Sequence, residues 1–141
     1  MKPAELRRQC LAHPGAAEEF PFGANVSVFK VAGKMFALSM LRRRPLKVSV
    51  KCEPELALQF RDSYESVEPG WHLNKRHWNT ITLGGDVSDR LARDMIEDSY
   101  DLVVAGLPRR ERERLRTLTA VASDSADSAA TTANSGTTGT R

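Results

Sequence analysis

The sequence predicts an α+β fold in which helices cover one face of a single antiparallel sheet. Residues 46–52 alternate between apolar and polar side chains, as a half-buried antiparallel strand does. Two strand-like runs flank the pair Ala32-Gly33, which is typical of a β-hairpin. Residues 86–106 instead repeat apolar positions at helical spacing, so an amphipathic helix is expected to pack on the sheet.

The N-terminal part is predicted to be one helix followed by an irregular segment. The helix is expected over residues 3–12, because Pro3 suits a first helical turn and Pro14-Gly15 ends the pattern. Residues 16–22 are interpreted as an irregular approach to the sheet.

Three strands are predicted next. Residues 26–31 and 34–40 form the hairpin, with Gly33 supplying the positive φ that a tight turn needs. Residues 46–52 form the third strand, whose apolar side chains face the core. Its outward side chains are Lys47, Ser49 and Lys51.

The rest of the domain is predicted as helix, strand and helix. A short helix begins near Pro54 and ends near residue 61, and residues 62–70 connect it to a strand over 78–83. In that strand Ile81 and Leu83 face the core, whereas the opposite side carries Trp78, Thr80 and Thr82. Asp86 or Ser88 caps the last helix, which ends at Gly106. The predicted core is Val28, Phe36, Leu38, Val48, Val50, Ile81, Leu83, Leu91, Met95 and Val103.

The chain of 141 residues is expected to hold one domain, over residues 1–116. Residues 109–116 are a charged extension that could continue as helix. Residues 117–141 are rich in Ser, Thr and Ala and bury almost nothing, so they are predicted to be a disordered tail.

Composition favours a cytoplasmic protein, because no apolar run suits a membrane span or a secretory signal. Cys10 and Cys52 are read as small buried hydrophobic residues, since neither has a second Cys or His at ligand spacing. No cofactor or metal is predicted. A monomer is favoured, although no pattern decides the oligomeric state.

Charge is distributed unevenly along the chain, although the net charge is only +3. The acidic residues are dense in residues 86–101, whereas residues 20–52 and 69–85 contain no Asp or Glu. If helices cover one face of the sheet, the other face should be positive. The candidate phosphate-binding residues are Lys30, Lys34, Arg42, Arg43, Arg44, Lys47, Lys51, Lys75 and Arg76.

Residues 69–80 combine aromatic rings, imidazoles and fixed positive charge without any acid. Proteins that hold single-stranded nucleic acid combine stacking rings with cations in this way. Beside the cations, the candidate contacts here are Trp71, His72, Asn74, His77 and Trp78. The competing interpretation is that both Trp residues cap the edge of the sheet and that the cations are ordinary solvated surface.

Several segments, taken in order, resemble the MmcQ/YjbR family of small bacterial proteins. They include Phe20-Pro21-Phe22-Gly23, Val48-Ser49-Val50-Lys51-Cys52-Glu53-Pro54-Glu55, Asn74-Lys75-Arg76-His77-Trp78-Asn79-Thr80 and Asp98-Ser99-Tyr100-Asp101-Leu102-Val103-Val104. The resemblance implies a two-layer frataxin-like or "double wing" fold and a DNA-binding function. It supplies no catalytic residues.

Three functions compete at this point. The favoured one is moderate, non-specific binding of nucleic acid, most simply DNA, through the phosphate backbone. An enzyme or metal protein is disfavoured, because the three His residues show no ligand or triad spacing and the acidic helix is better explained as a solvated face. The alternative is a module that binds a protein or a small ligand through the surface of Trp71 and Trp78, without catalysis.

Overall fold

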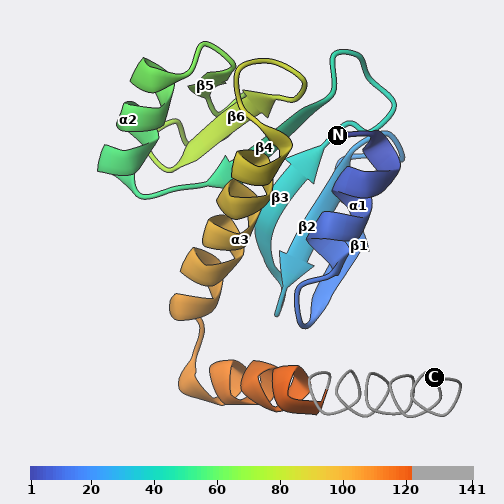
Figure 1. The fold of residues 1–141 in the computed structure, drawn as a ribbon. Coiled ribbons are helices and arrows are strands. Elements are labelled where there is room, and N and C mark those ends of the chain that lie inside the picture. The colour runs from blue at the N-terminus through green and yellow to red at the C-terminus, as the bar shows by residue number, and fades with distance from the viewer. Residues whose placement is uncertain (122–141) are drawn as a thin grey trace, which may run out of the picture. The chain divides into compact units, whose positions relative to one another are not determined.

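The computed structural model describes residues 1–121 and contains one six-stranded antiparallel sheet of strand order β1-β2-β3-β4-β6-β5. The α+β fold is therefore confirmed (Figure 1). In chain order the elements are α1 (Pro3–Leu11), β1 (Ala16–Glu19), β2 (Ser27–Val31), β3 (Lys34–Ser39), β4 (Lys47–Lys51), α2 (Pro54–Ser63), β5 (Val67–Pro69), β6 (Trp78–Thr82) and α3 (Asp89–Ala105).

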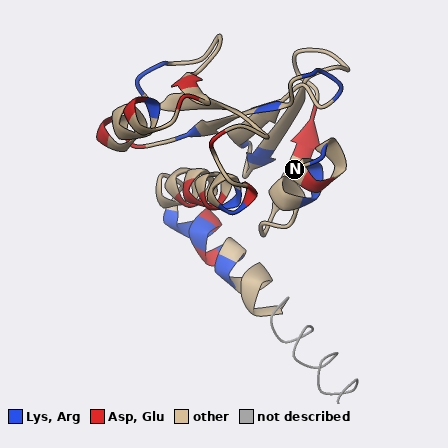
Figure 2. Cartoon of the chain, turned by 45° about the horizontal axis from the view of Figure 1, so that its top comes forward, with Lys and Arg blue, Asp and Glu red and all other residues tan. Residues whose placement is uncertain are grey.

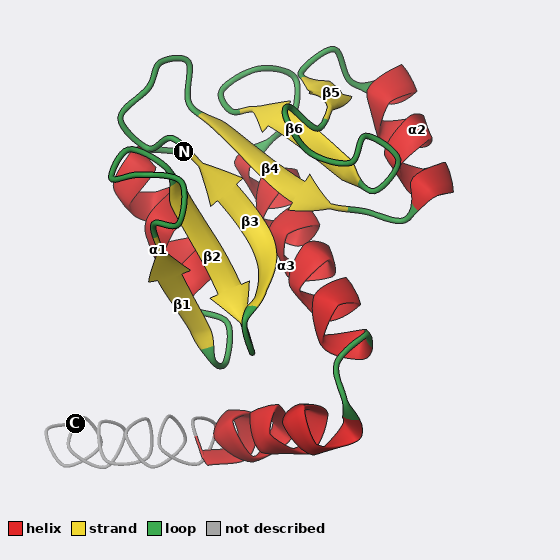
Figure 3. Cartoon of the chain, turned by 180° about the vertical axis from the view of Figure 1, so that it is seen from behind, coloured by secondary structure: helices red, strands yellow, loops and turns green. Residues whose placement is uncertain are grey.

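The helices leave one face of the sheet open. α3 packs against β3 and β4, α1 packs against β1, and α2 packs against β5 and β6. Seen from behind, the strands lie in front of α1 and α3 (Figure 3). The predicted arrangement of helices on one face is thus confirmed, and the opposite face is available for a binding surface.

A β-bulge in β3 turns an extra side chain toward the helices. Phe29 pairs with Ala37 and Lys30 pairs with Met35, so Phe36 has no partner on β2. A bulge of this kind re-aims the side chains of its strand. Phe36 is fully buried, and its ring packs edge-on against Tyr100 of α3 at a centroid distance of 5.3 Å.

Ser99 of α3 joins β3 to β4 near the point where their ladder ends. Its Oγ donates to the carbonyl of Phe36 at 2.6 Å and accepts from the backbone N–H of Lys51 at 2.8 Å. The register between the two strands covers only Ala37 with Val50 and Leu38 with Ser49. The hydroxyl therefore satisfies backbone groups of both strands beyond those pairs.

Two strands differ from the prediction. β1 lies in the segment expected to be irregular, and β5 lies in the segment expected to be a connection. Both are short edge strands, and β1 has the sequence Ala-Ala-Glu-Glu, which has no apolar alternation for a pattern to reveal. Glu18 of β1 is held instead by Arg7 of α1, at 2.7 Å.

The predicted helix cap and most of the predicted core agree with the structure. Ser88 caps α3, because its Oγ accepts from the N–H of Leu91 at 3.1 Å. Eight of the ten predicted core residues are buried, and Leu38 and Leu91 are half-buried instead. Leu38 lies on the open face of the sheet, and Ala92 occupies the fully buried position beside Leu91. Cys10 and Cys52 are buried free thiols, as expected.

The chain divides into a unit over Met1–Leu107 and a second unit that begins at Pro108. The predicted domain end at residue 116 lies within this second unit. The second unit contains a helix over residues 109–121, so the first five residues of the predicted tail are helical. The hydroxyls of Thr117 and Thr119 donate to carbonyls four residues earlier in this helix. Residues 122–141 of the predicted tail lie outside the described part of the chain.

Candidate functional site

The open face of the sheet is hollowed by a groove of about 700 Å³. Ser49 pairs in register with Leu38 and Thr80, and all three line this groove. The next residue of β4, Val50, lines a cavity beside the helices. Because side chains alternate along a strand, the groove lies on the face away from the helices. We call it the basic groove; its other lining residues are Ser39, Met40, Arg43, Arg44, Pro45, Lys47, Glu68, Pro69, Gly70, Trp71 and Lys75.

Hydroxyl groups form the floor of the basic groove. Ser49 Oγ and Thr80 Oγ1 are hydrogen-bonded at 2.8 Å, and both side chains are buried. The backbone N–H of Trp71 donates to Thr80 Oγ1 at 3.2 Å. This bond ties the start of the 70–77 loop to β6, so the loop borders the groove.

The walls of the basic groove are positively charged. Arg43 and Arg44 come from the loop after β3, Lys47 begins β4, and Lys75 comes from the 70–77 loop. Glu68 is the one acidic residue that lines the groove, and its carboxylate accepts from Lys47 Nζ at 3.2 Å. Figure 2 shows Lys and Arg on the loops at the sheet and acidic residues along α3. The groove therefore gathers cations from three segments of the chain. One of these cations, Lys47, is already paired with Glu68.

Trp71 supplies an exposed ring beside these cations. Its side chain is 53% exposed, and its ring centroid lies 4.6 Å from that of His72. His72 and Asn74 are also exposed, whereas His77 is half-buried. The positive φ of His72, 58°, marks the bend of this loop. The predicted aromatic and imidazole groups thus remain accessible on the loop, apart from Trp78.

Trp78 does not belong to the accessible surface. Its side chain is only 8% exposed. β6 lies between β4 and β5, so it is an inner strand, and the backbone of Gly70 lies against Trp78: a Cβ added to Gly70 would come within 2.6 Å of Trp78 Cβ. The prediction that Trp78 is a stacking group is therefore wrong, because the unpredicted β5 and the following loop cover that strand. The competing interpretation, in which both Trp residues cap the edge of the sheet, does not hold either, because Trp78 lies on an inner strand and Trp71 is exposed.

The structure places several predicted cations outside the basic groove. Lys34 starts β3 at the end opposite the Arg42-Arg43-Arg44 loop, and Lys51 ends β4 away from Lys47. Lys30 donates to Glu19 of β1 at 3.3 Å. Residues 20–52 contain no acid of their own, but β1 and β5 bring Glu19 and Glu68 to Lys30 and Lys47. Arg42 and Arg76 are exposed and do not line the groove.

Two residues that the sequence did not single out, Arg61 and Asn79, hold the 70–77 loop and the start of β6 to α2. Arg61 Nε donates to Asn79 Oδ1 at 2.6 Å, and its Nη2 donates to the carbonyls of Trp78 and Lys75. Asn79 is buried on β6, and its amide donates to the carbonyl of Ala57 at 3.2 Å. No local pattern could reveal this, because Arg61 occupies an ordinary polar position of a short helix.

One of the three histidines, His13, packs against α3. His13 stacks on Tyr100 at 4.7 Å, far along the sequence from His72 and His77, and burial lowers its pKa below the ordinary value. Within residues 1–121 no three His, Cys, Asp or Glu side chains converge on a point that could hold a metal ion. None of the helices there is long and apolar enough to cross a membrane.

A family model described as YjbR matches residues 11–102, which span the chain from the end of α1 into α3. The chain belongs to the YjbR family. It is 39% identical to the protein YbdF of Escherichia coli O157:H7 over 110 residues, which cover 78% of this chain and 90% of that protein. It is 35% identical to the protein YjbR of Escherichia coli K12, over 79% of this chain and 95% of that protein.

Solved structures agree with the fold. A Deinococcus radiodurans protein of the family-model domain DUF419 matches with a TM-score of 0.76 and 38% identity, over 81% of this chain and 87% of its own. A Pseudomonas syringae protein matches with a TM-score of 0.55 and 27% identity, over 62% of this chain and 86% of its own. These names state no ligand, so the argument for function rests on the basic groove of this chain.

Proposed function

We propose that this YjbR-family protein binds nucleic acid, most simply DNA, through the phosphate backbone at the basic groove. The observation that carries the proposal is that Arg43, Arg44 and Lys75, from loops more than thirty residues apart, border one hollow together with the exposed ring of Trp71. Neither arginine nor the lysine is paired with a carboxylate by an ion pair in the described chain.

The chemistry of these groups suits phosphate better than base edges. Arginine presents a planar fork of N–H donors to phosphate oxygens, and lysine adds a mobile point charge. Trp71 offers a flat face to a base of a single strand, and such stacking is sequence-tolerant. The groove is therefore suited to backbone binding with little sequence preference.

The magnitude of binding should be moderate. Lys47 already pairs with Glu68, which leaves three cations at the groove for phosphates. Three contacts predict a slope of about −2 to −3 in a plot of log binding constant against log salt concentration. The acidic residues of α3 lie on the helix-covered face, where they oppose binding only at long range.

Fluorescence anisotropy with labelled duplex DNA, single-stranded DNA and RNA at low salt tests the proposal. The double substitution Arg43→Ala/Arg44→Ala should weaken binding to all sequences similarly and should reduce the salt slope by up to about 1.8. The matched control is Arg8→Ala/Lys34→Ala, which removes the same charge outside the groove and should have a small effect.

Failure of the intact protein to bind any nucleic acid at low salt contradicts the proposal. Equal losses in the two double variants would show that only net charge matters, which contradicts the groove as the site. Binding of a protein partner through Trp71 would differ in its salt response, because an aromatic interface responds weakly to ionic strength.

A further inference from the structure

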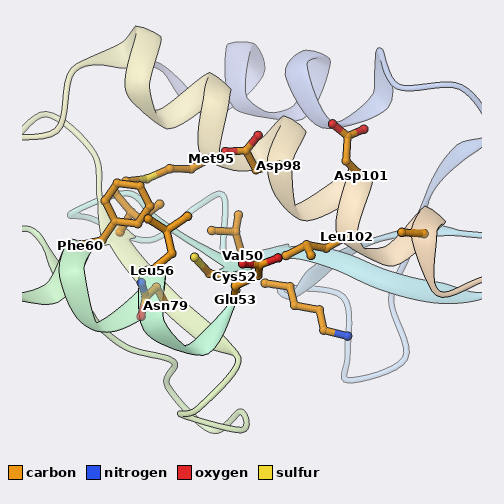
Figure 4. Close-up of a pocket in the computed structure, with 13 residues that line it drawn as sticks. Val50, Cys52, Glu53, Leu56, Phe60, Asn79, Met95, Asp98, Asp101 and Leu102 are labelled. Carbon is orange, nitrogen blue, oxygen red and sulfur yellow. The ribbon is translucent and has the colours of Figure 1, made fainter.

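The helix-covered face holds a second cavity, of about 350 Å³, which the proposed function does not use. It lies between α2 and α3, over β4 and β6 (Figure 4). Its volume falls at the lower end of the range for small-molecule pockets, about 300–1,000 Å³. We call it the interhelical cavity. It exists because α2 packs on β5 and β6 while α3 packs on β3 and β4, so neither helix fills the space between them.

The interior of the interhelical cavity is apolar. Figure 4 shows Leu56 and Phe60 of α2 on the side of Met95 of α3, with Val50 of β4 and the following Cys52 beside them. Its polar floor group, Asn79, already accepts from Arg61 and donates to Ala57. A ligand portion inside the cavity therefore finds apolar surface and gains by burial rather than by hydrogen bonding.

The rim of the interhelical cavity is acidic. Glu53, Asp98 and Asp101 line it with exposed side chains, and Lys51 is the one cation beside them in the lining. In Figure 4 the carboxylates of Asp98 and Asp101 point away from the apolar side chains. Burial raises the pKa of Asp98, and repulsion by Asp101 and Asp94 raises it further, as expected where carboxylates crowd together without enough counter-charge.

We propose that the interhelical cavity binds a small organic cation, with its apolar ring or chain among Leu56, Phe60 and Met95 and its ammonium group at the rim beside Asp98 and Asp101. A carboxylate ligand is repelled by the rim, and a neutral ligand gains only apolar burial. The site is on the opposite face from the basic groove and is independent of nucleic acid. Met95, in the lining, is a reporter of occupancy, because a bound ligand changes the surroundings of its methyl group.

Three probes of nearly the same shape test the charge preference on the full-length protein: 2-phenylethylamine, 2-phenylethanol and 3-phenylpropionate. Calorimetric titration at low salt should show the amine binding about two- to fivefold more tightly than the alcohol, the factor expected for one solvent-exposed ion pair, and the acid binding most weakly. The amine should also shift the methyl NMR signal of Met95, which lines the cavity. Met40, in the basic groove on the other face, is the internal reference and should not shift.

Substitutions at the rim separate charge from shape. Asp98→Asn/Asp101→Asn should bring the amine and the alcohol to equal affinity without changing the melting temperature by more than a degree or two. The control Glu97→Gln removes an acid of α3 that faces His13 rather than the cavity, and it should retain the preference for the amine. The proposal is overturned if no probe binds, if the amine binds no better than the alcohol, or if the bound amine leaves the Met95 methyl signal unchanged.

Discussion

Replacing Ser99 by Ala tests how the two halves of the sheet are joined. The Ser99 side chain is fully buried, and its Oγ donates to the carbonyl of Phe36 at 2.6 Å and accepts from the N–H of Lys51 at 2.8 Å. The substitution removes both partners and leaves a backbone acceptor on β3 and a backbone donor on β4.

The expected loss is about 2–3 kcal/mol of unfolding free energy. A buried group left without a partner costs about 1–3 kcal/mol. The carbonyl of Phe36 lies in a fully buried residue and should contribute most of the loss, whereas Lys51 is half-buried and water can partly satisfy its N–H. β3 and β4 share only two registered pairs and a bond from Ser39 Oγ to the carbonyl of Lys47, so few other contacts join them.

Urea unfolding followed by circular dichroism measures this loss as a lower midpoint at unchanged slope. The matched control is Ser88→Ala, which removes the exposed cap of α3 and should cost about 1 kcal/mol. If Ser99→Ala costs no more than Ser88→Ala, the hydroxyl does not join the strands and our account of this junction is wrong.

Arg61, Trp78 and His13 each allow a further test. Arg61→Ala should speed hydrogen exchange of the amides in residues 75–79, because Arg61 holds that segment to α2, and Arg61→Lys should not restore protection, since lysine lacks the planar fork. Trp78→Ala should destabilise the protein by about 3–5 kcal/mol, whereas Trp71→Ala should leave the melting temperature nearly unchanged; similar melting of the two variants would contradict the burial of Trp78. Burial lowers the pKa of His13 in the folded state, so unfolding takes up a proton and stability should fall as the pH drops below about 6.5. A His13→Gln variant should show a smaller fall between pH 7 and 5, and NMR titration of the wild type should place the pKa of His13 below the ordinary histidine value.

Local patterns predicted most of the fold. The hairpin around Gly33, the strand over β4 and the cap at Ser88 were all predictable, because turn chemistry, alternation and capping depend on residues close together in sequence. β1 and β5 were not predictable, because they are short edge strands whose existence depends on pairing with β2 and β6. The bulge at Phe36 and the bridge by Ser99 depend on tertiary packing in the same way.

By itself, the sequence determined the chemical character of the candidate site: cations without acids in residues 20–52 and 69–85, the second of which also carries both Trp residues. Only the tertiary structure decided which of these groups act together. It gathered Arg43, Arg44 and Lys75 around one groove and buried Trp78. It also brought Glu19 and Glu68 to Lys30 and Lys47. The physical reason is that charge pairing and burial depend on distance in space, and strand pairing brings together residues that are far apart in the chain.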